Sequence, residues 1–351
     1  MLRVESYSFN DLDKEKWLSL EKETGILSIF QTYSWAKVLS SIGSEPWFFI
    51  LEDHKKPLLG LLTFRNRFLW GAFLSYEAFG GPLSSSLVEK SAFNVFASEL
   101  KRAIKRMSML YFYWMPSPYS NLERYFVDHV FSQIPTATFI VDLRPSVEKL
   151  WGNLEGRARR AIKKAKRSGV NVFEAKSWRD WSEFYDLYVN EALHTAGPPY
   201  SRRLHKSIHK LLLPEKKAKL FVVERHNKII AGIVFLLTRD EMVGYRGASD
   251  IRYLNLSATS VIHWHAIGWA REQSIKYYDI GGALWKPEKN HFLYWVHMFK
   301  RQWGGKLYRF YSLASSRFYV VGRRFVFESS RIRRLYLALE RYGVIKRTDR
   351  I

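Results

Sequence analysis

The sequence predicts a mixed α/β protein that contains two copies of one structural unit. Phe49 to Gly60 aligns without a gap with Phe221 to Gly232, and five of the twelve positions are identical. Each segment has the pattern of a strand, a short polar turn and a second apolar strand, which is typical of a β-hairpin. The segments that follow the two hairpins also have the same order. Duplication of a mixed α/β unit is therefore the expected architecture.

The elements after each hairpin support this duplication. The first hairpin is followed by strand-like residues, by a helix-like segment over 86–107 with apolar residues on one face, and by a β-rich run over 109–115. The second is followed by a strand over 242–249, a helix-like segment over 256–275 and a strand over 277–282. The junction between the copies is expected near residues 138–150.

A basic helix is predicted where the second copy begins. Ala158, Ala161, Ile162 and Ala165 form a narrow apolar stripe at helical spacing, and Gly169 is expected to end the helix. Seven of the eleven residues from 157 to 167 are basic, more than a solvated face requires. This pattern favours a phosphate-contacting surface over a solubilising helix. The candidate nucleic-acid-binding residues are Arg157, Arg159, Arg160, Lys163 and Lys164.

Composition restricts the possible functions. The 351 residues include no cysteine, which excludes disulfides, cysteine-based zinc sites and a cysteine nucleophile. The charged N-terminus lacks a signal-peptide core, and the longest apolar run, 229–238, is too short to cross a bilayer. We therefore expect a soluble, cytoplasmic protein. The net charge of +23 indicates a polyanionic partner: nucleic acid, an anionic membrane face or a phosphate-bearing substrate.

The C-terminal tail, residues 316–351, is also basic. From residue 317 onward it has ten basic and three acidic residues, interleaved with large apolar side chains. This pattern fits peripheral contact with an anionic membrane at its inner face, or a nucleic-acid arm. A helix docked on the domain through its apolar face is an equal alternative.

Several segments together resemble FemAB-type aminoacyltransferases, such as those that build peptidoglycan interpeptide bridges. Their order and spacing match the family through most of the chain, in the segments 30–39, 78–83, 138–172, 278–282 and 299–305. The resemblance implies two tandem domains of the GNAT acyltransferase fold, with no sustained heptads for a coiled-coil arm. We expect domain 1 at 1–143 on the acceptor side and domain 2 at 144–315 on the donor and catalytic side.

The resemblance also implies an activity and its partners. Such proteins move an amino acid from aminoacyl-tRNA to an amine of a cell-wall precursor, without a ribosome. The expected partners are an aminoacyl-tRNA donor and a phosphate-bearing amine acceptor. We expect a monomer and no cofactor. No metal site is expected, because the histidines lack an accompanying acidic ligand at the required spacing.

The candidate site residues come partly from the resemblance. It places Lys300 at the family's Phe-Lys pair, where its ammonium would meet the reacting carbonyl and stabilise the oxyanion. Phe299 would pack beneath the terminal adenosine. Lys37, with Trp35 on the same predicted helix, would bind the phosphates of the acceptor.

Further candidates come from the residues themselves. Asp279 ends a strand before Gly281 and Gly282, where a carboxylate can accept or orient the amine's proton. Asp-x-Gly-Gly is also ordinary turn chemistry, and we favour that reading. The glycines permit close backbone approach or positive φ. Tyr245 and Arg246 lie on a strand expected to line the site, where Arg246 can bind phosphate or carboxylate.

Two departures leave alternatives open. Met115 stands where many relatives have an acid, which puts the family's general-base mechanism in doubt. The region 247–258 lacks the glycine-rich turn that holds the pyrophosphate of acetyl-CoA in ordinary GNAT enzymes, which weakens a CoA donor. The alternatives are an N-acyltransferase that uses acyl-CoA on an amino sugar or polysaccharide precursor, and a non-catalytic protein that binds nucleic acid or a membrane surface.

Overall fold

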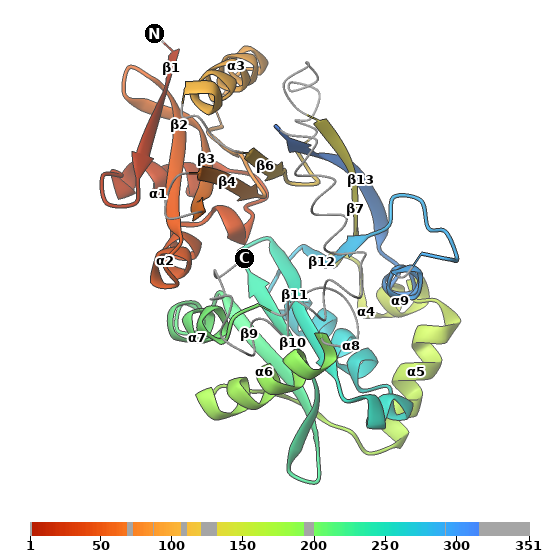
Figure 1. Ribbon diagram of the computed structural model, residues 1–351. Helices are drawn as coiled ribbons and strands as arrows, with labels where there is room; N and C mark the ends of the chain where they lie inside the picture. Colours follow the sequence, from red (N-terminus) through yellow and green to blue (C-terminus); the bar gives the residue numbers. More distant parts are fainter. Residues whose placement is uncertain are drawn as a thin grey trace. The chain divides into compact units, whose positions relative to one another are not determined.

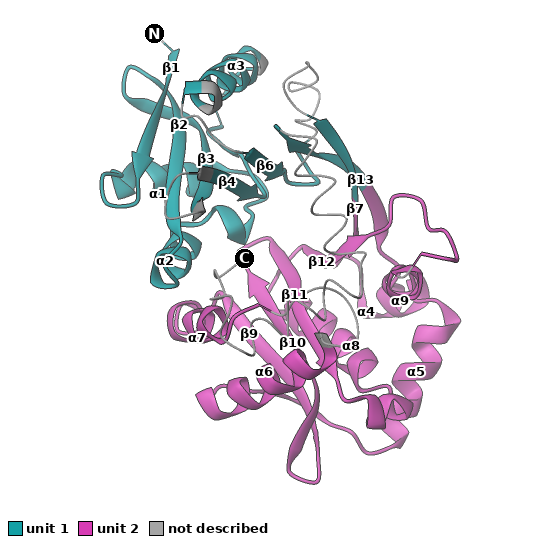
Figure 2. Ribbon diagram, viewed as in Figure 1, with its two compact units in different colours: residues 1–136, 309–325 teal, residues 137–308, 326–351 magenta. Residues whose placement is uncertain are grey.

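The computed structural model describes residues 2–68, 73–86, 88–106, 111–120, 132–192, 200–291 and 293–315 (Figure 1). The chain divides into two compact units, residues 1–136 with 309–325, and residues 137–308 with 326–351 (Figure 2). Both are mixed α/β units, as predicted. The expected roles of the basic tail concern residues outside the described part of the chain.

Unit 1 begins with a strand and two helices and continues as a sheet that is antiparallel except for one parallel pair. Strands β1, β2, β3, β4 and β6 lie in this order, β5 pairs with β3, and only β4 and β6 run parallel. Helix α3 packs Phe96 and Leu100 into the core on this sheet. The elements are β1 (Leu2–Ser8), α1 (Lys14–Glu23), η1 (Ile29–Gln31), α2 (Tyr33–Ser41), β2 (Glu45–Asp53), β3 (Lys56–Phe68), β4 (Phe73–Phe79), β5 (Leu83–Ser84), α3 (Lys90–Arg106) and β6 (Tyr111–Met115).

Unit 2 has the same plan with more helices. Its strands follow the order β7, β12, β11, β10, β9, β8, and β11 and β12 are parallel. The boundary between the units falls within β7 and β13. The elements are β7 (Ser132–Asp142), α4 (Val147–Asn153), α5 (Gly156–Arg167), β8 (Val172–Glu174), α6 (Trp178–Ala192), α7 (Arg202–Leu211), β9 (Ala218–Arg225), β10 (Lys228–Leu237), β11 (Glu241–Ser249), η4 (Ile251–Leu256), α8 (Ala258–Glu272), β12 (Tyr277–Ala283), α9 (Tyr294–Arg301) and β13 (Lys306–Ala314).

Helices cover both faces of the sheet in unit 2. Ala231 and Ile233 on β10 belong to the core that α5 and α8 complete with Ile162 and Ile262. Gly232, between them in the sequence, faces Phe184 of α6. Because successive side chains of a strand point to opposite faces, α6 covers the face opposite to α8.

The two predicted hairpins are confirmed, and they share two details of structure. Each turns through two residues with positive φ, His54 and Lys55 in one copy and His226 and Asn227 in the other, the geometry of a type I′ turn. The aligned glycines also have equivalent roles. A Cβ on Gly60 would lie 2.7 Å from the ring of Trp17 on α1, and one on Gly232 would lie 2.6 Å from the ring of Phe184 on α6. In both copies a helix therefore lays an aromatic ring directly on the strand.

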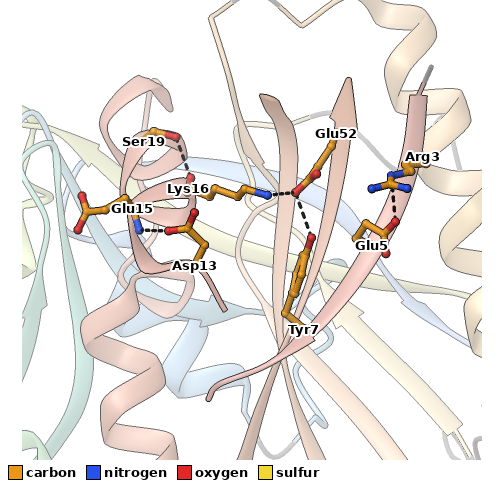
Figure 3. A network of polar contacts seen from close by, with 8 residues as sticks. All are labelled: Arg3, Glu5, Tyr7, Asp13, Glu15, Lys16, Ser19 and Glu52. Atoms are coloured by element: carbon orange, nitrogen blue, oxygen red, sulfur yellow. Dashed lines mark hydrogen bonds and ion pairs between the residues drawn. The ribbon is translucent and has the colours of Figure 1, made fainter. Parts of the chain in front are cut away.

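The copies differ at the aligned glutamates. Glu52 is 1% exposed, and its carboxylate accepts hydrogen bonds from Nζ of Lys16 at 2.9 Å and from the hydroxyl of Tyr7 at 3.3 Å (Figure 3). Glu224, its counterpart in unit 2, is exposed to solvent. A buried carboxylate is stable only when it is paired and hydrogen-bonded, so this network fixes α1 and β1 on β2 in unit 1 alone.

Candidate active site

The parallel strand pairs of the two units end differently. In unit 1, β4 and β6 stay paired from Ser75–Tyr111 to Phe79–Met115, the last residue of each strand. In unit 2, the pairing of β11 with β12 stops at Val243–Asp279, although β11 continues to Ser249. Strands that part in this way leave main-chain groups facing no neighbouring strand, as at a sheet edge where a ligand can bind.

The side chain of Lys300 lies at this point of separation. It comes from α9, and its Nζ donates a hydrogen bond to the carbonyl oxygen of Gly282 at 2.8 Å. Gly281 has φ +91°, and a Cβ placed on it would lie 3.3 Å from Nζ of Lys300. A side chain at Gly281 would thus be strained by the backbone and would crowd the ammonium.

Three charged groups influence one another here. Burial lowers the pKa of Lys300 to about 8, the carboxylate of Asp279 opposes that change, and the guanidinium of Arg246 adds to it. Burial also raises the pKa of Asp279, against hydrogen bonds from Thr138 and Gly281 and the charge of Lys300. The site therefore holds a partly desolvated ammonium that is readily titrated near neutral pH.

Asp279 is anchored by the fold. Its Oδ1 accepts from the backbone N–H of Gly281 at 2.7 Å and also from the hydroxyl of Thr138 on β7. The first contact is the local turn chemistry that the sequence favoured for this residue. The carboxylate thus shapes the turn and at the same time acts electrostatically on Lys300.

Arg246 lies within a group of tyrosines on β11 and its neighbours. Its guanidinium carbon is 3.9 Å from the ring centre of Tyr200 and 4.3 Å from that of Tyr245. The hydroxyl of Tyr188 also hydrogen-bonds Arg246 and accepts from the backbone N–H of Tyr200 at 3.1 Å. Contacts with two neighbouring rings restrict the orientation of the planar guanidinium.

A buried pair lies behind Lys300 that the sequence did not assign to the site. Nδ1 of His263 on α8 is 2.6 Å from the hydroxyl of Tyr278 on β12. Burial and the charge of Lys300 lower the pKa of His263 to about 3, so the imidazole is neutral. Its ring packs 5.4 Å from Phe299 and 4.8 Å from Trp303. Because these residues come from separate elements, no local spacing could reveal the cluster.

Phe299 and Trp35 serve as packing residues in this structure. Phe299 packs against the unit 2 core, on His263 and Trp303. Trp35 on α2 of unit 1 is 1% exposed and lies edge-on to Phe30 at 5.2 Å, where it does not face solvent. Lys37 on the same helix is partly exposed, with its ammonium 5.7 Å from the ring centre of Tyr33.

The predicted basic helix is confirmed as α5. Its apolar stripe is buried through Ala158, Ile162 and Ala165. Four of the five candidate nucleic-acid-binding residues are exposed, namely Arg157, Arg160, Lys163 and Lys164. Arg159 differs, because its guanidinium hydrogen-bonds main-chain carbonyls at the end of α4. Its position indicates a structural role.

Two features are absent from the described part of the chain. It contains no group of three or more histidine or acidic side chains able to hold a metal ion. None of its helices combines the length and apolarity needed to cross a membrane.

A family model matches part of unit 2. Residues 153–292 match the family model described as "Acetyltransferase (GNAT) domain". This match shows a GNAT-type domain within residues 137–308 of unit 2. No curated protein matches the chain in sequence.

Several solved structures have a similar fold over most of the chain. The structure of FemX is similar with a TM-score of 0.71 at 14% identity, covering 89% of this chain and 97% of that one. L-PGS from Bacillus licheniformis has a TM-score of 0.58 at 14% identity, covering 92% and 97%. A tandem GNAT protein from the clavulanic acid biosynthesis pathway has a TM-score of 0.53 at 10% identity, covering 90% and 98%. The expected FemAB-type likeness is thus confirmed at the level of the fold.

Proposed function

We propose that this protein is an aminoacyltransferase that moves an amino acid from aminoacyl-tRNA to an amine of a cell-wall or peptide precursor. The observation that carries the proposal is the partly desolvated ammonium of Lys300, held against Gly282 where β11 and β12 part. The fold shared with FemX supports aminoacyl transfer, and the GNAT domain match supports acyl transfer in general.

The chemistry needs alignment and charge stabilisation. The amine nitrogen of the acceptor attacks the ester carbonyl, and a tetrahedral intermediate forms with negative charge on the former carbonyl oxygen. Lys300 donates a hydrogen bond to that oxyanion. Removal of one such donor from an oxyanion hole lowers the rate by about 10²–10³. When the intermediate collapses, the C–O bond to the ribose breaks and the amide remains. The attacking amine loses one proton and the ribose oxygen gains one.

Asp279 is a candidate carrier for that proton. Burial raises its pKa, which makes the carboxylate a better base than an exposed aspartate. Its bonds to Gly281 and Thr138 leave it close enough to Lys300 for the two charges to interact. Asp279 in unit 2 could thus supply the acid–base group that unit 1 lacks at Met115.

The donor is inferred from helix α5. It has seven basic residues and no acidic residue between Gly156 and Arg167, the electrostatic pattern of a phosphate-binding surface. We infer that residues 144–315 form the donor and catalytic side, and that residues 1–143 receive the acceptor, with Lys37 binding its phosphates. Arg246 would bind an anionic group of either substrate. The proposed setting is the cytoplasm, where charged tRNA is available.

Transfer from acyl-CoA to an amino sugar is the second candidate. It is favoured by the match to a GNAT acetyltransferase domain and by the likeness to a tandem GNAT protein. Helix α8, which follows β11, begins after Ser257 without a side-chain cap, and a helix N-terminus can hold phosphate. The segment before α8 is the 3₁₀ turn η4 and carries no glycine, unlike a glycine-rich pyrophosphate turn.

One experiment separates these functions. Purified wild type is incubated with an amine acceptor and either labelled aminoacyl-tRNA or labelled acetyl-CoA, and the label in the amide product is counted. We expect product from aminoacyl-tRNA only, at least 100-fold less with Lys300→Met, and wild-type activity with the exposed control Lys289→Met. Product from acetyl-CoA alone would establish the second candidate, and no product from either donor would favour a binding protein.

A further inference from the structure

The connection between α4 and α5 is a rigid elbow. Only Leu154 and Glu155 separate the two helices. Nη1 of Arg159 on α5 donates to the carbonyl oxygens of Gly152 at 3.0 Å and Leu154 at 2.6 Å, with a longer contact to Trp151 at 3.4 Å. One guanidinium thus satisfies carbonyl groups that the end of α4 would otherwise leave without partners.

The elbow is fastened to the C-terminal end of α9. The backbone N–H of Glu155 donates to the carbonyl oxygen of Gln302 at 2.9 Å. Its side-chain Oε1 accepts from Nε of Arg301 at 2.9 Å. Gly304 has φ +74°, and a Cβ on it would lie 2.7 Å from the carbonyl oxygen of Asn153. The two segments therefore meet backbone to backbone, with no room for a side chain at Gly304.

This contact joins two parts of the proposed site. Lys300 is the residue before Arg301, one position from the ion pair. On the other side of the elbow, α5 begins immediately after Glu155, and its twelve residues extend for about 18 Å. The proposed phosphate-binding helix and the ammonium that would meet the reacting carbonyl thus flank one contact, in which Glu155 supplies the side-chain ion pair.

We propose that Glu155 is a positioning residue that fixes the distance between α5 and Lys300. Donor RNA bound along α5 would then place its aminoacylated 3′ end at a fixed distance from Lys300. The inference rests on the proposed function, because it takes RNA as the ligand of α5. The role of Glu155 can be tested separately from RNA binding, because Glu155 acts on the geometry of transfer and contributes nothing to RNA affinity.

Other contacts show why the end of α9 matters. The helix has only eight residues, and Leu293 at its N-cap makes no side-chain capping bond. His297 is fixed by the N–H of Leu284, which donates to its Nδ1 at 3.3 Å. The turn that carries Lys300 is followed at once by the contacts with Glu155. An error of about 1 Å in such a group can cost on the order of 100-fold in rate.

The test compares Glu155→Ala with Glu155→Gln, which keeps an oxygen acceptor for Arg301. Affinity is measured with uncharged tRNA, and kcat and KM with aminoacyl-tRNA. For Glu155→Ala we expect tRNA affinity within about threefold of wild type and kcat reduced about tenfold. Glu155→Gln should recover most of that loss. The matched control is Glu215→Ala, which removes a partly exposed ion pair with Lys217 elsewhere in unit 2.

A reciprocal variant completes the design. Lys163→Gln with Lys164→Gln, on the exposed face of α5, should weaken tRNA binding and lower its salt dependence by about two phosphate contacts. Wild-type kcat in Glu155→Ala, with Lys300→Met inactive, would overturn the positioning role and leave the proposed function standing. Loss of tRNA affinity in Glu155→Ala would also overturn it. Absence of both tRNA binding and transfer in wild type would overturn both proposals.

Discussion

The titration of Lys300 gives the sharpest prediction of the proposed mechanism. Its pKa is lowered from 10.5 to about 8, mainly by burial. The ammonium is therefore present below pH 8 and is lost as the pH rises through that value. Oxyanion stabilisation needs the charged form, so kcat for transfer should fall tenfold per pH unit well above pH 8. At lower pH, protonation of the acceptor amine should limit the rate instead.

Replacement of Lys300 should affect activity far more than the free energy of unfolding. A change of pKa from 10.5 to about 8 corresponds to ~3 kcal/mol of unfavourable charge burial, which partial exposure reduces to about 1–2 kcal/mol. Lys300→Met removes that cost and also leaves Asp279 without its cation. Because these effects oppose each other, we expect the free energy of unfolding to change by less than about 1 kcal/mol. Activity should nevertheless fall by about 10²–10³.

The assay is single-turnover amide formation from pH 6 to 10, with unfolding followed by denaturant titration. Lys300→Arg keeps its charge throughout this range and should lose the alkaline fall, at a lower rate because its geometry differs. Lys300→Met should also lose it. A wild-type rate that stays constant between pH 7.5 and 9.5, or an alkaline fall that persists in Lys300→Met, would refute the role of the ammonium.

Three further substitutions test the fold and the site. Gly281→Ala, at φ +91° and with its Cβ 3.3 Å from Nζ of Lys300, should cost about 1–2 kcal/mol and at least tenfold in transfer; normal transfer would show that the ammonium tolerates crowding. Gly232→Ala places a Cβ 2.6 Å from Phe184 and should destabilise by about 1–3 kcal/mol in thermal unfolding, unless the ring can shift. Lys16→Met removes the ammonium from the buried carboxylate of Glu52 and should cost about 2 kcal/mol in urea unfolding; an unchanged midpoint would mean that Tyr7 suffices.

Patterns that repeat along the chain predicted the architecture well. The aligned hairpins carry their turn residues and glycines at the same positions, and both details have a structural counterpart. Helix α5 was predictable because Ala158 and Ile162 mark a stripe that only helical periodicity produces. Such patterns are local in the sequence, so they can be detected without knowledge of the tertiary fold.

Features that depend on tertiary contacts were beyond sequence reasoning. Arg159 has the same character in the sequence as Arg160, yet it is turned toward the end of α4. His263 and Tyr278 lie fifteen positions apart on different elements and meet only in the folded core. Trp35 is buried because α2 packs on the sheet of unit 1. In each case the role of the residue depends on its burial and on its contact partner. Neither can be inferred from the spacing of residues in the sequence.

The crowded surroundings of Gly281 have a consequence for the history of such chains. A single added methyl group beside Lys300 would interfere with transfer and leave the rest of the sheet, the hairpins and α5 as they are. Under the proposed function, one codon change at Gly281 would therefore lower transfer at least tenfold in a copy that still folds and keeps α5. A duplicated gene with this change would encode a folded protein of reduced activity whose basic helix is intact.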